Sequence, residues 1–440
     1  MFTLKQGNTL PTFNYDLSIS ERFPVMDRSY KVDSSILNRS FRSNMPINAN
    51  INNGSIDENY CEFMINSNEQ EFVDTSSFAL EMKIKIVPTT GGSIEDSSII
   101  QLVDGFPLML LKRCNVTLNS VSVETHSHFG LLNTINAYLN MDKNFIHTIG
   151  KNMCLKDLNS KIPDKFTTEN LTSETKDDFY NPKQIMHFMI PLNFDISNLN
   201  FFLLNGVDIG IRFDLASPAL VINSLDANKY TYQLQSCKLW MERLSPSPDA
   251  LISLNKNMIR YTKSVEYIYE RPIVKQYIFP KGHSVISLDD IFNGVVPHRI
   301  VAFLIRQKAL NGAFDYNSLH LHHCNISSID LDINGSSVSA LKGAFPNEVA
   351  QMFHNTLNNL INHNNLLSLQ SFVDGRTINV WNLKTSLCED VLNVEKGGNI
   401  RINMQTNSPL NDNYVVMIIG VTTGVFDIDA MRRVKTSFVI

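Results

Sequence analysis

Several features that identify common enzyme classes are missing from this sequence of 440 residues. The phosphate-binding pattern GxxxxGK(S/T), the dinucleotide pattern GxGxxG after a strand, the zinc pattern HExxH and the nucleophile pattern GxSxG do not occur. We find no catalytic constellation elsewhere in the chain. We therefore predict that the protein is not an enzyme, and we expect no catalytic residues, no cofactor and no metal ligands.

Cysteine is scarce, and no CxxC pair occurs. The six cysteines are widely and irregularly spaced, at Cys61, Cys114, Cys154, Cys237, Cys324 and Cys388. Such spacing does not indicate a disulfide scaffold, and reduced thiols in an intracellular protein are the better interpretation. The N-terminus lacks the charged-then-apolar pattern of a signal peptide. We expect a protein that is made inside the cell and is not secreted.

An excess of charge of one sign is also missing, and so is a long hydrophobic run. The 38 basic and 43 acidic residues give a net charge of −5. Proteins that coat nucleic acid usually need a basic excess, so we expect no sequence-specific nucleic-acid partner. The longest apolar stretch, residues 414–426, is interrupted by Gly420 and Gly424. It is too short and too broken to span a bilayer, so we expect no transmembrane segment.

Alternation of apolar and polar side chains is the main positive signal. From Phe78 to Ile86, every second residue is apolar, which places five apolar side chains on one face of a strand. Further strand-like runs lie at residues 207–215, 231–241, 299–305, 329–333, 399–404 and 414–421. Asn-Gly, Asp-Gly and Gly-Gly pairs between the runs predict turns. Many short strands with frequent turns favour β-sandwiches or barrels.

Three segments have the pattern of short helices. Apolar residues at helical spacing predict one helix over residues 129–140 and a second, after Pro346, that ends near Ile361. A third candidate covers residues 248–258, between the two halves of the chain. The fold class that we predict is therefore all-β with a few short helices.

The sequence also contains an internal repeat. A block that contains Gly206, Ile209, Ile211, Phe213, Ser217 and Pro218 corresponds to Gly397, Ile400, Ile402, Met404, Ser408 and Pro409, and each pair is 191 residues apart. Upstream of these blocks, residues 114–119 and 329–334 each precede a predicted helix. Two correspondences in the same order favour duplication. We predict two similar tandem β-sandwiches, the first at residues 58–244 and the second at residues 262–440.

The remaining segments are predicted to connect or extend the sandwiches. Residues 245–261 contain the third helical candidate and form the predicted linker helix. Residues 1–57 are polar, with short aromatic islands, and show little alternation. We interpret them as an extended N-terminal arm and hypothesise that the arm ties subunits together or reaches a neighbouring assembly.

Two histidine clusters have features of metal sites. His320, His322 and Cys324 would share one face of a strand, which is metal-like spacing, but no acidic residue lies close to them in the sequence. His126 and His128 lie at a loop-to-helix junction. We interpret both clusters as polar or packed structural residues, and we interpret the carboxylates Asp177 and Asp178 as part of a solvated loop.

Several segments resemble the major capsid proteins of Polinton/Maverick elements and adintoviruses, within the wider lineage of double jelly-roll capsids. The resemblance is carried by residues 294–301, 309–314, 323–326 and 329–335, and by residues 72–76, 111–119, 205–208, 243–248 and 425–429, in family order. The sequence departs from the family at residues 127–130, where Ser-His-Phe-Gly replaces Tyr-Pro-Tyr, and at residues 319–321. Residues 1–54 match no part of the pattern.

The resemblance implies a function that the spacing alone does not. Members of the family have two tandem jelly rolls per subunit and form homotrimers, which are pseudo-hexagonal blocks of an icosahedral shell. The implied partners are copies of the chain itself and the penton or minor capsid proteins, and the implied location is the virion capsid. The insertion at residues 157–182 would form an outer tower or trimer contacts.

Three alternatives remain open on the sequence. A lectin-like β-sandwich module would need exposed aromatic residues, and the chain has two tryptophans, Trp240 and Trp381. A jelly-roll enzyme of the cupin type would need a metal held by His and Glu. A minor or penton capsid protein usually has one jelly roll, so the duplication argues against it.

Overall fold

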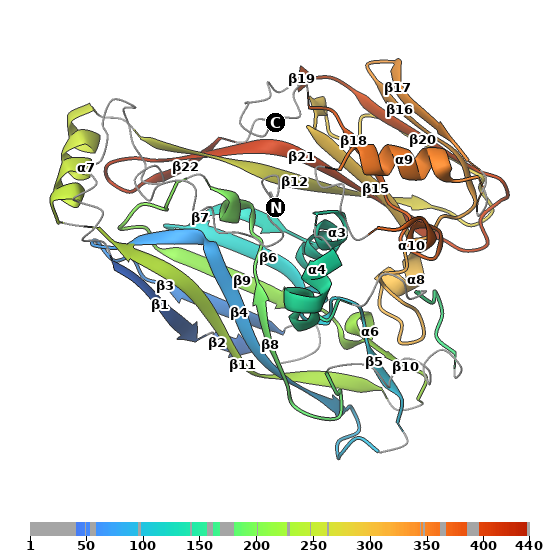
Figure 1. Ribbon diagram of the computed structural model, residues 1–440, viewed down its shortest axis with the longest axis horizontal. Coiled ribbons are helices and arrows are strands. Elements are labelled where there is room, and N and C mark those ends of the chain that lie inside the picture. The colour runs from blue at the N-terminus through green and yellow to red at the C-terminus, as the bar shows by residue number, and fades with distance from the viewer. Residues whose placement is uncertain are drawn as a thin grey trace.

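The computed structural model describes residues 41–48, 50–52, 59–95, 98–140, 143–155, 162–167, 180–199, 201–226, 229–246, 248–261, 264–343, 345, 348–360, 367–384 and 396–437. Within these residues the chain forms two β-sandwiches, one after the other. The first sandwich lies in the lower half of Figure 1 and the second in the upper half. The predicted fold class, all-β with a few short helices and two tandem jelly-roll sandwiches, is confirmed.

The first sandwich consists of two main sheets, a small sheet and short helices. Its strands are β1 (Phe41–Asn48), β2 (Asn50–Asn52), β3 (Tyr60–Ile65), β4 (Phe72–Pro88), β5 (Ile100–Leu102), β6 (Leu111–Leu118), β7 (Val121–His126), β8 (Met186–Pro191), β9 (Ile209–Leu215), β10 (Ile222–Ser224) and β11 (Tyr230–Ser245). Its helices are α2 (Phe106–Met109), α3 (Phe129–Asn140), α4 (Lys143–Phe145), the π-helix η2 (Ile146–Gly150), the 3₁₀-helix η3 (Asp195–Asn198) and α6 (Pro218–Val221).

Helix α7 (Pro248–Tyr261) separates the two sandwiches in the sequence. The strands of the second sandwich are β12 (Val265–Phe279), β13 (Val285–Leu288), β14 (Val295–Val296), β15 (Arg299–Arg306), β16 (Ile326–Ile333), β17 (Ser336–Lys342), β18 (Asn379–Asn382), β19 (Lys396–Gly397), β20 (Ile400–Thr406), β21 (Tyr414–Ile428) and β22 (Val434–Ser437). Its helices are α8 (Gln307–Leu310), α9 (Ala350–Asn358) and α10 (Leu369–Val373).

Both sandwiches have the same strand connectivity. In the first, sheet 1A has the order β1-β11-β4-β8, and sheet 1B has the order β3-β9-β6-β7 with β2 beside β3. In the second, sheet 2A has the order β12-β21-β15-β18 with β22 beside β21, and sheet 2B has the order β13-β20-β16-β17. The eight strands of sheets A and B in each sandwich can be numbered in chain order, leaving out β2 and β22. Each A sheet then has the order first-eighth-third-sixth, and each B sheet has the order second-seventh-fourth-fifth. Eight strands in two sheets with this connectivity form a jelly roll.

The internal repeat of the sequence falls on equivalent strands. Residues 209–215 and 400–406 form β9 and β20, which are the seventh strands of their sandwiches. Residues 114–119 and 329–334 belong to the ends of β6 and β16, the fourth strands, and to the turns that follow them. Helices α3 and α9 each follow the fifth strand. The repeated pattern therefore marks the same position in two like domains.

The first sandwich begins earlier than the predicted boundary at residue 58. Strand β1 pairs with β11 in antiparallel register, from Phe41 opposite Ser245 to Asn48 opposite Lys238. Phe41, Met45 and Ile47 alternate with polar residues, but the run is short and contains a proline, and we did not predict a strand there. Its hydrogen-bonding partner lies about 200 residues away in the chain. The arm that we predicted over residues 1–57 thus contributes two strands, and residues 1–40 lie outside the described part of the chain.

The hydrophobic core has two parts. One part lies between sheets 2A and 2B, with Leu304, Ile402 and Val416 among its members. The other fills the first sandwich and continues onto the opposite face of sheet 2A, where it includes Phe303 and Met417. The central strands β15 and β21 of sheet 2A are therefore buried on both faces over most of their length, whereas β4 of sheet 1A alternates between buried and more exposed side chains along its second half.

Candidate functional site at the junction of the two sandwiches

The junction is formed by the outer face of sheet 2A, the face turned away from sheet 2B. Val301, Phe303 and Ile305 of β15 point to this face, opposite Ile419, Met417 and Val415 of β21. All six side chains belong to the same core cluster as helix α3 of the first sandwich. Helix α3 lies between the two sandwiches in Figure 1. The two domains thus share a continuous apolar core, which favours a rigid two-domain unit over two domains that move independently.

Two tyrosines of β12 reach into the first sandwich. The hydroxyl of Tyr267 accepts a hydrogen bond from the Leu204 N–H at 3.1 Å and donates one to the Phe202 carbonyl at 3.0 Å. The hydroxyl of Tyr269 donates to the Val123 carbonyl at 3.2 Å. Burial raises the pKa of both phenols, which stay neutral. The two hydroxyls provide hydrogen-bond partners for buried backbone groups of the first sandwich, so the junction contains polar contacts as well as apolar ones.

A buried arginine of the second sandwich meets an acid and an aromatic ring of the first. Arg376 is fully buried, and its Nη2 lies 3.5 Å from Oδ2 of Asp104. Its guanidinium lies over the ring of Tyr138, 5.3 Å from the centroid, and the Tyr138 hydroxyl donates to the same Asp104 oxygen. Burial raises the pKa of Tyr138 well above its usual value. The three side chains connect α3 to the segment after α10.

A second cross-junction ion pair lies near the histidine-rich segment. Asp164 accepts two hydrogen bonds from Arg306, at 3.2 and 2.6 Å, and its Oδ1 lies 3.0 Å from His322 Nε2. Burial alone would raise the pKa of Asp164, but hydrogen bonds from His322 and Arg306 hold it below its usual range. A bidentate arginine–carboxylate contact is directional as well as charged, so it fixes the orientation of the segment that carries Asp164.

The predicted structural interpretation of His320, His322 and Cys324 fits their surroundings. His320 Nδ1 donates to the Ile162 carbonyl at 2.8 Å, and burial lowers the pKa of His320 to about 4. Cys324 lies in a turn with a φ of 46°, not on a strand. The three residues therefore do not share the strand face that we expected. Asp177 and Asp178 lie outside the described residues.

The other histidine cluster acquires partners that are distant in sequence. His126 Nε2 lies 2.8 Å from Oδ2 of Asp195 and 3.4 Å from Oε1 of Glu124, and all three residues are buried. Glu124 and His126 alternate on β7, so they point to the same side of the strand, and Asp195 is the first residue of η3. His126 was singled out from the sequence, but neither Glu124 nor Asp195 was, because no local pattern connects the two acids to it.

The electrostatics of this cluster are those of a buried charge network. Burial, and then the charge of Asp195, raise the pKa of Glu124 to about 7. Burial lowers the pKa of His126, but the two carboxylates outweigh it and raise that pKa to about 10. Glu124 Oε2 accepts hydrogen bonds from the N–H groups of Asp195 and Ile196, at 2.9 and 3.5 Å, and so caps η3. Oε2 of Glu124 thus accepts backbone hydrogen bonds, whereas Oε1 has, among the described residues, only the 3.4 Å contact with His126.

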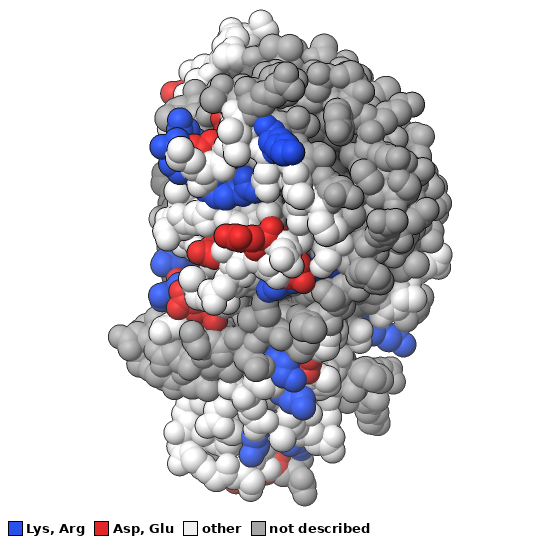
Figure 2. Space-filling view, turned by 90° about the vertical axis from the view of Figure 1, so that its left-hand side faces the viewer, with Lys and Arg blue, Asp and Glu red and all other residues white. Residues whose placement is uncertain are grey.

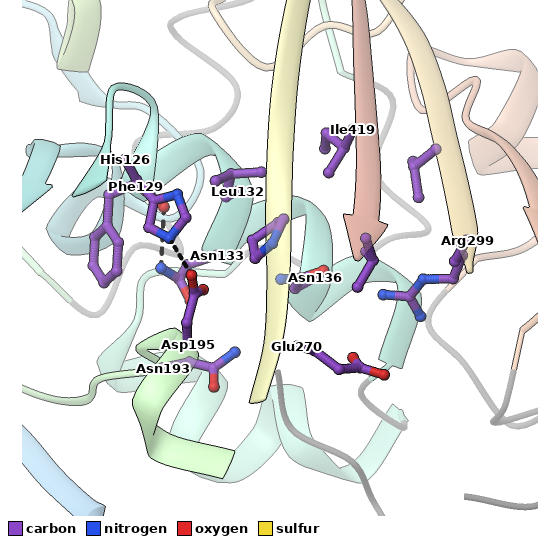
Figure 3. A pocket seen from close by; sticks show the side chains of 13 residues that line it. His126, Phe129, Leu132, Asn133, Asn136, Asn193, Asp195, Glu270, Arg299 and Ile419 are labelled. Atoms are coloured by element: carbon purple, nitrogen blue, oxygen red, sulfur yellow. Dashed lines mark hydrogen bonds and ion pairs between the residues drawn. The ribbon is translucent and has the colours of Figure 1, made fainter. Parts of the chain in front are cut away.

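A cavity at the junction adjoins the cluster. His126, Phe129 and Asp195 line one side of it, and Glu270 and Arg299 of the second sandwich line the other (Figure 3). The centre of a water molecule can occupy about 30 Å³ of this space, which is room for at least one water. Lys384 and Arg299 outweigh the effect of burial and lower the pKa of Glu270. The cavity is therefore lined by charged groups from both domains.

No known family model and no curated protein sequence matches the chain. Solved structures do match it. A chain in the cryo-EM structure of the Sputnik virophage is 11% identical, with a TM-score of 0.60 over 90% of this chain and 88% of that one. The Faustovirus major capsid protein is 8% identical, with a TM-score of 0.55 over 91% and 92%. The mavirus major capsid protein is 11% identical, with a TM-score of 0.52 over 100% and 96%.

These likenesses concern the fold, because the identities are low. They extend over nearly the whole length of both chains, so they cover both sandwiches and not one of them. The Faustovirus and mavirus neighbours are named as major capsid proteins. No helix in the described residues is long and apolar enough to cross a membrane. The chain has the double jelly-roll fold that these viral major capsid proteins share.

Proposed function

We propose that this protein is a major capsid protein whose copies associate as homotrimers, in which six sandwiches form one pseudo-hexagonal block of an icosahedral shell. The observation that carries the proposal is the unequal burial of two equivalent sheets. Sheet 2A is covered on its outer face by the first sandwich of the same chain, whereas no element in the described part of the chain packs over the outer face of sheet 1A. A second copy of the chain would cover it.

The outer face of sheet 1A is defined by its register. Lys238, Glu81 and Met189 lie side by side on β11, β4 and β8. The next rows on the same face contain Trp240, opposite Ala79, and His187, opposite Lys83. Met189 is 39% exposed, and Ile185, just before the start of β8, is 56% exposed. The face therefore mixes charged groups with exposed apolar side chains, a composition found in protein interfaces that are formed after folding.

The polar groups of this face already have fixed positions. Glu81 accepts a hydrogen bond from Trp240 Nε1 at 2.8 Å, and it lies 3.1 Å from His187 Nε2 and 3.8 Å from Lys238 Nζ. The hydrogen bond from Trp240 lowers the pKa of Glu81. Trp240 is thus held in the sheet, and Trp381 is buried, so neither forms the exposed aromatic patch that the lectin-like alternative needs.

In a ring of six like sandwiches, each A sheet faces the next sandwich. Within one chain, sheet 2A faces α3 of the first sandwich. If neighbouring copies repeat this arrangement, sheet 1A of one copy faces α9 of the second sandwich in the next copy, because α9 is the counterpart of α3. Three copies close the ring, because each contributes two of the six positions.

The distribution of charge supports self-association rather than a nucleic-acid coat. Figure 2 shows the face at the left of Figure 1, where basic and acidic side chains are interspersed among uncharged ones in the described residues. Mixed charges of this kind allow copies of one chain to approach each other. We further propose, from the sequence resemblance, that the protein belongs to the Polinton/Maverick and adintovirus type, meets penton and minor capsid proteins, and resides in the virion capsid.

The test is the oligomeric state of the purified full-length chain, measured by size-exclusion chromatography with light scattering. We expect a mass three times that of one chain, and a hexagonal outline in electron microscopy. Met189→Glu places a new charge in the proposed contact and should convert trimers into monomers. Met64→Glu is the matched control, because Met64 is 55% exposed on sheet 1B and lies outside the contact. A monomeric wild-type protein, or a trimer that Met189→Glu leaves intact, would contradict the proposed interface.

A further inference from the structure

We propose that Glu124, His126 and Asp195 form a binding site for a divalent metal ion of the zinc class, which would join β7 to η3 beside the junction of the two sandwiches. The site does not depend on the capsid function proposed above. We predicted no metal ligands from the sequence, and Asp195, the third residue of this site, is 69 residues from His126 in the chain.

The three donor atoms already converge. One nitrogen and two carboxylate oxygens, one from each residue, all lie within 4.8 Å of one another. His126 Nε2 lies 3.4 Å from Glu124 Oε1 and 2.8 Å from Asp195 Oδ2. Ligands about 2.0–2.1 Å from a tetrahedral zinc ion are about 3.3 Å apart. A metal ion could therefore replace the proton between His126 and Asp195 with small side-chain movements.

A second observation points to a missing partner. Glu124 is 2% exposed, and its Oε1 accepts no hydrogen bond from the described residues, while Oε2 caps η3. A buried carboxylate oxygen without a hydrogen bond is costly, so such atoms normally indicate a bound ion or water. Oε1 is the oxygen that faces His126 Nε2, which is the position a metal ion would share.

The cavity supplies the rest of a coordination sphere. His126 and Asp195 form part of its wall, together with Asn133 and Asn193 (Figure 3). Its room for at least one water would allow a solvent molecule to be the fourth ligand. Three protein ligands with one open position are a common arrangement for zinc.

Charge and ligand type narrow the choice of metal. Two carboxylates and a neutral imidazole balance a divalent cation, so the occupied site would carry no net charge in a buried environment. Ca²⁺ and Mg²⁺ prefer oxygen ligands alone, whereas an imidazole nitrogen suits later transition-metal ions such as Zn²⁺, Ni²⁺ and Co²⁺. We therefore expect these three ions to bind and Mg²⁺ not to compete.

The experiment uses the untagged full-length chain, purified without chelator. Elemental analysis should find about one zinc per chain, and Co²⁺ added after removal of zinc should give the visible absorption of a low-coordinate cobalt site. EDTA should lower the Tm, and Zn²⁺ should restore it. The isosteric variants Glu124→Gln and Asp195→Asn should bind Zn²⁺ at least about ten-fold more weakly, because each removes one anionic ligand.

The control variant is His283→Gln, which removes an exposed histidine from the turn before β13, outside both the site and the proposed contact, and should keep full zinc binding. The proposal is overturned if the wild-type chain binds none of the three ions and EDTA leaves its Tm unchanged. It is also overturned if zinc binding is lost in His283→Gln and retained in Glu124→Gln and Asp195→Asn. If both of those variants fail to fold, the effect of EDTA and zinc on the wild-type Tm decides the question.

Discussion

Asn119 and Asp208 are joined by two hydrogen bonds, and Asn334 and Asn399 repeat the same pair in the second sandwich. The Oδ1 atoms of Asn119 and Asn334 accept from the N–H groups of Asp208 and Asn399, each at 2.8 Å. Their backbone N–H groups donate to the carbonyls of the same two residues, each at 2.9 Å. Jelly-roll topology does not require this side-chain contact. Its recurrence at equivalent positions therefore supports duplication of one ancestral domain.

The first prediction concerns these two turns. Asn119 and Asn334 have φ values of 46° and 52°, a region that asparagine tolerates better than alanine. Asn119→Ala and Asn334→Ala each remove the side-chain acceptor and add backbone strain. We expect each to lower the free energy of unfolding by about 1–3 kcal/mol, measured by urea denaturation.

Glycine variants separate the two causes. Asn119→Gly and Asn334→Gly lose the hydrogen bond but tolerate the positive φ, so they should cost less than the alanine variants. Asn119 Nδ2 also donates to the Arg432 carbonyl, so its replacement should cost more than that of Asn334. Equal stability of the glycine and alanine variants would show that the backbone conformation contributes nothing.

The second prediction concerns the buried contact of Arg376 with Asp104. Arg376→Met keeps the volume of the side chain but leaves the Asp104 carboxylate buried without its cation. We expect a loss of about 3–5 kcal/mol in the free energy of unfolding, because breaking a buried ion pair leaves an uncompensated charge. Chemical denaturation followed by intrinsic fluorescence measures it.

A double variant tests the electrostatic reason. Asp104→Asn combined with Arg376→Met removes the unpaired charge, so it should recover part of the lost stability. Additive losses in the double-mutant cycle would mean that the two residues do not interact and would contradict the contact.

Much of the fold could be predicted because its signals are local. The alternation from Phe78 to Ile86 corresponds to the inward-facing residues of β4, and the helix predicted over residues 129–140 is α3. The second helix, α9, begins at Ala350 and ends at Asn358, so it is shorter than predicted. Apolar residues recur every two positions in a half-buried strand and about every 3.6 positions in a helix with one buried side, so the sequence itself shows these elements.

The junction could not be predicted in the same way, because its contacts join distant segments. Asp195 reaches His126 only because η3 packs against β4 and β12 beside the end of β7. Outside the junction, β1 is likewise held by pairing with the distant β11. One local feature does indicate the junction. The apolar run from Ile300 to Ile305 lacks alternation, and such runs indicate a strand buried on both faces. It marked β15 as the strand at the centre of the junction.

The third prediction concerns pH in the metal-free protein. The pKa of Glu124 is raised to about 7 and that of His126 to about 10, so the folded state holds protons more tightly than the unfolded state. The stability that these protons contribute is fully present at low pH. It is lost as the pH rises through about 4.5–7 for Glu124 and about 6.5–10 for His126.

The measurement is the Tm from pH 5 to pH 9 in the presence of EDTA. We expect the wild-type chain to lose on the order of 1–3 kcal/mol of stability toward high pH relative to Glu124→Gln, which has no proton to lose at this position. Parallel pH profiles for the two proteins would show that Glu124 is already ionised at pH 5 in the folded state.

The last prediction concerns the close approach of α3 to α2. Alanine is normally favoured over glycine inside a helix by about 1 kcal/mol. A Cβ on Gly130, however, would lie 2.2 Å from the Leu108 carbonyl oxygen and 2.8 Å from Met109 Cα, and both are backbone atoms that cannot rotate away. Gly130→Ala must therefore push α3 away from α2, at a cost of about 1–3 kcal/mol or more. The matched control is Gly397→Ala, where the nearest atom lies 3.8 Å from the added Cβ and no change is expected. Thermal denaturation compares the two variants, and a Gly130→Ala protein as stable as wild type would mean that the two helices are not in this contact.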